Sequence, residues 1–220
     1  MKKKIIIVCG DPHSINSEII YKTWNKLNSK LRKNIFLIGN YDLILSQIKK
    51  LKKKNIFVKI NHLDKVVNSN KFKIIDVPLK FKHPFNVPSK NAKKYVINSL
   101  NIAHQLATEH NIKGLINCPI NKKLIQSSHK VGVTEFFASK CKIKDNSEVM
   151  VIHNDKLSVV PITTHIDLNK VSNSINQKII INKMKTLNKY FKKIFKKKPA
   201  IAVLGLNPHN AEFRKNSKEI

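Results

Sequence analysis

Short apolar runs alternate with longer amphipathic stretches along the N-terminal part of the chain. The run Ile5–Val8 is continuous and β-branched, which is typical of a strand covered on both faces, and further strands are predicted at residues 34–39 and 56–60. Helices are predicted between them, one beginning near Ser17 as its capping residue and one over residues 41–53. The order βαβαβ favours a largely parallel sheet with helices packed on it.

A proline-rich segment at residues 78–88 interrupts this alternation, because three prolines exclude long regular structure there. Helices and strands are then expected to resume. They comprise a helix capped by Ser89 and running to about Thr108, a strand at 114–117, two hairpin strands at 148–153 and 157–162, a lysine-rich helical region at 167–198 broken once, and a final strand at 200–206. The predicted fold class is therefore α/β with a mostly parallel sheet.

The charge of the chain raises nucleic acid as a partner. The 220 residues carry 43 Lys+Arg against 13 Asp+Glu, a net charge of +30, while 41% hydrophobic residues exclude a disordered basic tail. Arg32 and Arg214 are the only arginines, although recognition of bases and phosphates favours the guanidinium group. Lysine, asparagine and isoleucine all have AT-rich codons, so we interpret the charge mainly as compositional drift and expect no nucleic-acid partner.

Cysteine usage and hydropathy indicate the compartment. Cys9, Cys118 and Cys141 are scattered and lack CxxC spacing, which argues against a disulfide framework and a zinc ribbon. The apolar run near the N-terminus stops at Cys9, and no segment approaches the ~20 apolar residues that span a bilayer. We therefore expect a cytoplasmic protein without a membrane partner.

Polar groups collect just beyond the carboxyl ends of predicted strands, the edge at which open α/β sheets bind ligands. Four segments share this property: residues 10–12, 117–122, 163–165 and 207–209. His165 and His209 are candidate ligands for Zn²⁺ or a similar ion, and the alternative is that both are ordinary surface or core histidines. Thr134 is expected either to cap a helix or, with Lys122, to hold a phosphate or carboxylate at its N-terminus.

The same loops resemble a known family in their order along the chain. Five motifs carry the resemblance: residues 10–12 with Glu18, residues 118–122, residues 132–137, Thr163-Thr164-His165, and residues 204–209 with Glu212. They are similar to those of 4-hydroxythreonine-4-phosphate dehydrogenases, the PdxA family of vitamin B6 biosynthesis. The resemblance extends over essentially the whole chain, and its most specific parts are the segments LGLNPH and TTH.

The resemblance implies a homodimeric oxidoreductase of three-layer α/β/α architecture, like that of the isocitrate and isopropylmalate dehydrogenases. Such an enzyme uses NAD or NADP and a divalent metal (Zn²⁺, Mg²⁺ or Co²⁺) to oxidise 4-phosphooxy-L-threonine, and the product loses CO₂ to give 3-amino-2-oxopropyl phosphate. The resemblance implies that His165 and His209 are metal ligands and that Thr134 contacts the substrate, with Lys122 meeting its phosphate. It assigns no catalytic acid or base to this chain.

Two departures from the family bear on activity. Val133 stands where the family has a histidine that contacts the substrate, which leaves open a paralogous enzyme acting on another phosphorylated hydroxy acid, such as 4-phosphoerythronate or 4-phosphothreonate. The family's third metal histidine lies beyond a position equivalent to Ile220, so residues 1–220 are expected to form a single, incomplete α/β unit of a two-subdomain enzyme, weakly active or inactive alone. The rival hypothesis of another class is a basic nucleic-acid-binding module.

Overall fold

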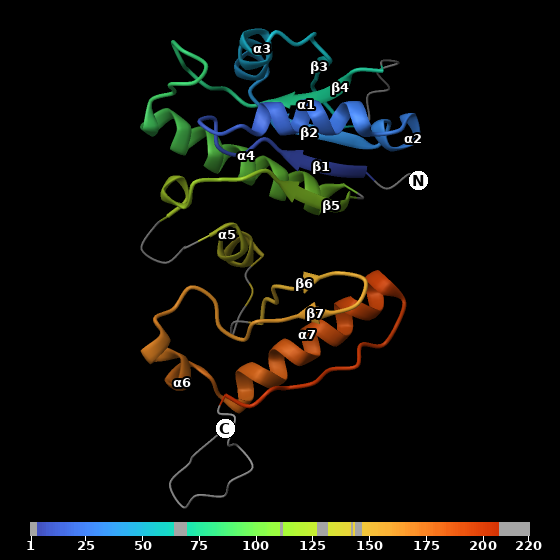
Figure 1. The fold of residues 1–220 in the computed structure, drawn as a ribbon, viewed down its shortest axis with the longest axis vertical. Coiled ribbons are helices and arrows are strands. Elements are labelled where there is room, and N and C mark those ends of the chain that lie inside the picture. Colours follow the sequence, from blue (N-terminus) through green and yellow to red (C-terminus); the bar gives the residue numbers. More distant parts are fainter. Residues whose placement is uncertain are drawn as a thin grey trace, which may run out of the picture. The chain divides into compact units, whose positions relative to one another are not determined.

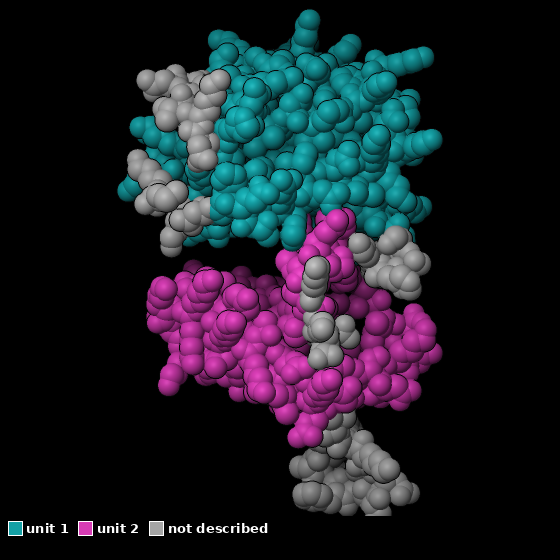
Figure 2. Space-filling view, turned by 180° about the vertical axis from the view of Figure 1, so that it is seen from behind, with its two compact units in different colours: residues 1–133 teal, residues 134–220 magenta. Residues whose placement is uncertain are grey.

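The computed structural model describes residues 4–63, 70–110, 112–126, 132–141, 143 and 147–206. The chain divides into two compact units, residues 1–133 and 134–220, coloured separately in Figure 2. No helix within the described ranges is both long and apolar enough to cross a membrane.

Unit 1 is built on a sheet of five parallel strands (Figure 1). The strands are β1 (Lys4–Val8), β2 (Ile35–Gly39), β3 (Phe57–Ile60), β4 (Phe72–Asp76) and β5 (Ile112–Asn117), and their spatial order is β3-β4-β2-β1-β5. Each pairing is parallel, which confirms the predicted sheet. The sequence analysis missed β4, in which Lys73 interrupts an otherwise apolar run.

Helices cover both faces of this sheet. They are α1 (Asn16–Lys26), α2 (Ser29–Arg32), α3 (Tyr41–Lys50), α4 (Ser89–Glu109) and the 3₁₀ turn η1 (Lys122–Leu124). Successive residues of a strand point to opposite faces, and Ile35 and Leu37 of β2 pack with residues of α1 and α3 in one cluster. Helix α4 contacts β1, β2 and β5. The three-layer α/β/α arrangement is therefore confirmed.

The centre of the core lies between α1 and the sheet. Trp24 of α1 is 2% exposed and stacks on Phe72 of β4 with ring centroids 4.2 Å apart. Phe57 of β3 also stacks on Phe72, with ring centroids 5.9 Å apart. Such aromatic pairs contribute about 0.5–1.5 kcal/mol beyond the burial of their area. The aromatic cluster thus holds α1 against the half of the sheet formed by β3 and β4.

The two helix caps predicted in unit 1, Ser17 and Ser89, are wrong. Helix α1 starts at Asn16 after Ile15, so Ser17 lies inside the helix, where its hydroxyl bonds to Gln47 and not to the backbone of the first turn. Helix α4 starts at Ser89 itself, after Pro88, without a side-chain cap. The fixed φ of Pro88 is already suited to a helix entry, which leaves less for a serine cap to contribute. By contrast, Asn40 accepts from the Leu43 N–H and caps α3.

Unit 2 contains little regular structure besides one long helix and one hairpin. Its elements are α5 (Val133–Lys140), β6 (Ile152–His153), β7 (Ser158–Val159), η2 (Leu168–Lys170), α6 (Val171–Ser174) and α7 (Gln177–Phe195). The first residue of α5, Val133, is the last residue of unit 1. The antiparallel pairing of β6 with β7 confirms the predicted hairpin, although both strands are shorter than expected. The predicted break in the lysine-rich helical region is also confirmed, between α6 and α7.

The prediction of a final strand at residues 200–206 is wrong. These residues have no strand assignment, and Val203, Leu204 and Leu206 are each more than half exposed. A strand needs a neighbour to take its N–H and C=O groups, and within the described residues the hairpin strands pair only with each other. The apolar pattern of this segment is therefore present without the pairing that would make it a strand.

Candidate functional site

The order of the strands defines a switch point at β1. From β1 the chain passes through α1 and α2 to β2 on one side, and later through α4 to β5 on the other side. Figure 1 shows β1 and β5 side by side, as their register requires. In open α/β sheets, ligands bind in the crevice beyond the carboxyl ends of the strands at such a point. The loops that follow β1 and β5 therefore form the candidate site of unit 1.

These two loops are held together through backbone groups. Gly10, directly after β1, has a φ of +75°, and the Asp11 N–H donates to the Pro119 carbonyl at 3.1 Å. The buried Asn16 side chain donates through Nδ2 to the carbonyls of Cys9 and Pro119, both at 2.8 Å. The structure thus brings together two of the four polar segments predicted from the sequence, residues 10–12 and 117–122.

A second set of hydrogen bonds connects the loop after β1 to the proline-rich loop after β4. The Asp11 carboxylate accepts from the backbone N–H of His13 at 2.9 Å and lies 3.0 Å from its Nδ1. The Nε2 of His13 donates to the Val87 carbonyl at 2.7 Å, because a carbonyl can only accept. His13 therefore bridges the loops that follow β1 and β4.

Gln47 of α3 makes a parallel connection between the same loops. Its side chain is 2% exposed, and Nε2 donates to the carbonyls of Pro12 at 2.9 Å and Pro84 at 2.7 Å. Its Oε1 accepts from the hydroxyl of Ser17. The sequence analysis missed Gln47, although a signal was present: it occupies the same helical face as Leu43, Ile44 and Ile48, where an unpaired amide would be costly.

The cysteines next to these loops are not suited to nucleophilic chemistry. Burial raises the pKa of the Cys118 thiol to about 11, and burial followed by the proximity of Cys118 raises that of Cys9 well above its ordinary value. Burial likewise raises the pKa of the Tyr95 hydroxyl, which accepts from the Asn40 N–H at 3.2 Å. Because thiolates and not thiols are nucleophiles, both cysteines act here as small core residues.

The predicted anion-binding residues occupy different units. Lys122 is exposed and opens η1, three residues after Pro119 at the carboxyl edge of the sheet. Thr134 is exposed in unit 2, and α5 starts at Val133, so the prediction that Thr134 caps this helix is wrong. Thr134 instead lines an apolar cavity of about 820 Å³ in unit 2, together with side chains of α5 and α7 that include Phe137 and Tyr190.

The predicted metal ligands are only partly described. His165 is exposed in unit 2 and adopts a left-handed conformation with φ +57°, while His209 lies outside the described residues. Among the residues with described positions, no group of three His, Cys, Asp or Glu side chains is placed to hold a metal ion. The described side chains therefore supply one of the two predicted ligands and no complete metal site.

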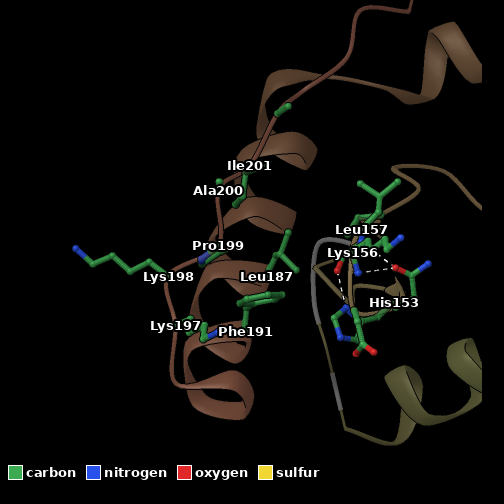
Figure 3. Close-up of a pocket in the computed structure, with 15 residues that line it drawn as sticks. His153, Lys156, Leu157, Leu187, Phe191, Lys197, Lys198, Pro199, Ala200 and Ile201 are labelled. Carbon is green, nitrogen blue, oxygen red and sulfur yellow. Dashed lines mark hydrogen bonds between the residues drawn. The ribbon is translucent and has the colours of Figure 1, made fainter.

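A smaller pocket of about 390 Å³ in unit 2 contains none of the predicted site residues (Figure 3). Leu187 and Phe191 of α7 line one side of it, and His153 and Leu157 of the hairpin line the other. The Nδ1 of His153 lies 2.7 Å from the Ser158 hydroxyl, and its ring packs 4.7 Å from that of Phe195. These contacts explain His153 as a residue that holds the hairpin to α7.

The chain also matches known proteins over nearly its whole length. Residues 12–219 match the family described as "Pyridoxal phosphate biosynthetic protein PdxA". The 4-hydroxythreonine-4-phosphate dehydrogenase of Aquifex aeolicus is 33% identical over 221 residues, covering 100% of this chain and 67% of that protein. The enzyme of the same name from a Sulfurihydrogenibium species is 36% identical, covering 95% and 64%.

The fold agrees with this match. The crystal structure of 4-hydroxythreonine-4-phosphate dehydrogenase from Klebsiella pneumoniae superposes with a TM-score of 0.80 at 26% identity, covering 96% of this chain and 66% of that one. The chain thus spans about two thirds of the length of the relatives it matches. With residues 12–219 matched by the family and a relative one third identical over the whole chain, the protein belongs to the PdxA family.

Proposed function

We propose that this protein serves as an NAD- or NADP-dependent dehydrogenase of 4-phosphooxy-L-threonine in the synthesis of pyridoxal phosphate. Oxidation of the secondary alcohol gives 2-amino-3-oxo-4-phosphooxybutanoate, and loss of CO₂ from this 3-oxo acid gives 3-amino-2-oxopropyl phosphate. The observation that carries the proposal is the family match over residues 12–219, with relatives of that name at 33% and 36% identity. The strand order supports it from the structure, because α/β sheets bind ligands at a switch point like that between β1 and β5.

Lys122 is the proposed phosphate-binding residue of unit 1. Lys122 opens η1 in the loop that follows β5, at the carboxyl edge of the sheet, and a compact positive charge suits a phosphate monoester. Thr134 is the proposed second substrate contact, through its hydroxyl.

His165 and His209 are the proposed ligands of a divalent cation, Zn²⁺, Mg²⁺ or Co²⁺. Such an ion, when bound to the substrate hydroxyl, lowers its pKa and favours the alkoxide from which hydride leaves. Imidazole nitrogens suit Zn²⁺, whereas Mg²⁺ prefers oxygen ligands. The remaining parts of the proposal are a homodimer, which the resemblance to the family implies, and a cytoplasmic location, which the scattered cysteines favour.

The substrate is tested by incubating the purified protein with NAD⁺ or NADP⁺, a divalent metal and 4-phosphooxy-L-threonine, and following the reduced nicotinamide by its absorbance. We expect at most weak turnover of this substrate, because residues 1–220 alone are expected to be weakly active or inactive, and none when the nucleotide is omitted. The variant Lys122→Met should raise KM at least about tenfold, as expected for a lost charged hydrogen bond, whereas the adjacent, equally exposed Lys123→Met should not. Faster turnover of 4-phosphothreonate or 4-phosphoerythronate would replace the substrate, and failure of all three compounds to bind in isothermal titration calorimetry would refute the proposal.

The metal site is tested independently of turnover by equilibrium dialysis with Zn²⁺. We expect His165→Ala and His209→Ala each to weaken binding at least about tenfold, because loss of one ligand removes a metal–nitrogen bond. His62→Ala serves as the control, since His62 is an exposed histidine of unit 1. Equal affinities in all three variants and the wild type would exclude both proposed ligands.

A further inference from the structure

The loop after β1 (residues 9–15) and the loop after β4 (residues 77–88) are joined by buried hydrogen bonds from Gln47, which lies outside the segments that carry the family resemblance. Gln47 donates to one backbone carbonyl in each loop, at 2.9 Å to Pro12 and 2.7 Å to Pro84. It also accepts from Ser17 at the start of α1. One side chain on α3 thus takes part in three contacts with segments far apart in the sequence.

The carbonyls that Gln47 satisfies have few alternatives. Gln47 is 2% exposed, so water does not reach the amide readily, and a buried carbonyl without a donor is costly. If the amide were removed, the two loops would relieve this cost by moving toward solvent. The position of the loop after β1 therefore depends on Gln47 as well as on its own sequence.

This position is transmitted to the loop that carries Lys122. The loop after β1 contacts the loop after β5 through Asp11 N–H and Asn16 Nδ2, both of which donate to the Pro119 carbonyl. Only Ile120 and Asn121 separate Pro119 from Lys122. A shift of residues 10–16 therefore displaces the segment that presents the Lys122 ammonium group.

We propose that Gln47 is a positioning residue of the ligand site: by clamping the loop after β1 to the loop after β4, it holds the loops at the β1–β5 switch point in the arrangement that binds substrate. The proposal rests on the proposed dehydrogenase function for its kinetic consequence. Its structural consequence, the coupling of the two loops, is independent of the substrate. Gln47 touches no reacting atom in this arrangement and acts only through the backbone of its neighbours.

The test compares three variants of the full chain. Gln47→Met removes both donors and the acceptor at nearly constant volume. Ile48→Val shortens the next residue of α3, which is 1% exposed and packs in the core, and so destabilises unit 1 without touching either loop. Gln105→Met makes the same chemical change on α4, where the amide donates only to the exposed Glu109.

Amide hydrogen exchange and steady-state kinetics are measured on all three. In Gln47→Met we expect exchange of the Ser14 and Asn86 amides, which lie in the two loops, to rise together about tenfold at least, as for loss of a buried hydrogen bond. We also expect KM for the phosphorylated substrate to rise about tenfold with kcat less affected. The two control variants should leave both loop exchange and KM near wild-type values.

Loop exchange and KM that change equally in Gln47→Met and Ile48→Val would overturn the proposal, because Gln47 would then be an ordinary core residue. Faster exchange in only one of the two loops would overturn it as well, since the clamp requires both to be released. If the wild type binds none of the phosphorylated substrates, the proposed function fails, and the exchange comparison alone decides whether Gln47 couples the loops.

Discussion

Replacement of Gly10 by alanine is the sharpest test of the contact between the loops after β1 and β5. Gly10 has a φ of +75°, a conformation that glycine adopts without cost and other residues rarely adopt. A Cβ at this position would lie 2.6 Å from the Pro119 carbonyl oxygen, 2.8 Å from Asn16 Nδ2 and 2.9 Å from the Cys118 carbonyl oxygen. Two of these atoms belong to the backbone, so the loops must separate to admit the methyl group.

The expected loss of stability has three parts. The left-handed backbone costs about 1–2 kcal/mol for alanine. Separation of the loops weakens the two hydrogen bonds to the Pro119 carbonyl, from Asp11 and Asn16, at about 1 kcal/mol each. Alanine also restricts the unfolded chain, which offsets about 0.4–1 kcal/mol. The variant should therefore be less stable by about 2–4 kcal/mol.

Urea unfolding followed by tryptophan fluorescence measures this change, because Trp24 is the only tryptophan and is buried in unit 1. With a typical slope for a small domain, the midpoint should fall by about 1–2 M urea. Gly114→Ala on β5 is the matched control, since a Cβ there would meet nothing within 4 Å and its φ is not in the left-handed range. Equal midpoints for Gly10→Ala and Gly114→Ala would refute the proposed close approach of the two loops.

Three further predictions concern the cysteines and the core of unit 1. A thiol reagent at neutral pH should modify Cys141, which is exposed, and neither Cys9 nor Cys118, which are buried; rapid modification of all three thiols would contradict this. Because burial raises the pKa of Cys118 from 9.0 to about 11 and that of Cys9 in the same direction, the folded state retains these protons more strongly than the unfolded state. The stability that this contributes is complete below about pH 9 and is lost as the pH rises toward 11, so the urea midpoint should fall over this range, and Cys118→Ala should flatten the decline. Trp24→Ala should cost about 3–5 kcal/mol in unfolding followed by circular dichroism, because it removes a buried ring stacked on Phe72 at 4.2 Å; a loss below about 1.5 kcal/mol would show that the site collapses around the substitution.

The parallel sheet could be predicted because most of its strands have a recognisable local sequence pattern. Continuous β-branched runs such as Ile5–Val8 indicate strands buried on both faces, and the helices between them leave few topologies. Strand β4 was not predicted, because Lys73 interrupts its run of apolar residues. The structure shows that this lysine is buried along its stem and donates to the Lys33 carbonyl at 2.8 Å, a long-range contact with no trace in the local pattern.

The candidate site could be predicted as a set of loops but not as a set of contacts. Polar segments after strands identified residues 10–12 and 117–122, which the sheet order places next to each other. Their connection through Asn16 and Gln47 depends on pairs of residues separated by up to 103 positions, and sequence periodicity carries no information at that range. In unit 2 a strand was predicted that the structure does not form: residues 200–206 have the apolar pattern of a strand but pair with no other strand among the described residues.

The structure also changes what the charge of +30 means. Lysine in this chain serves partly as a long apolar side chain with a donor at its end: Lys73 extends over the ring of Phe36, with Nζ 4.6 Å from its centroid, and burial lowers its pKa. Lys183 is 8% exposed on α7 and donates to the Glu148 carbonyl at 2.7 Å. These two lysines are largely buried and donate to backbone carbonyls, so part of the net charge serves the fold of the protein. The position of Lys122 at the carboxyl edge of the sheet is a more specific feature for phosphate binding than the net charge.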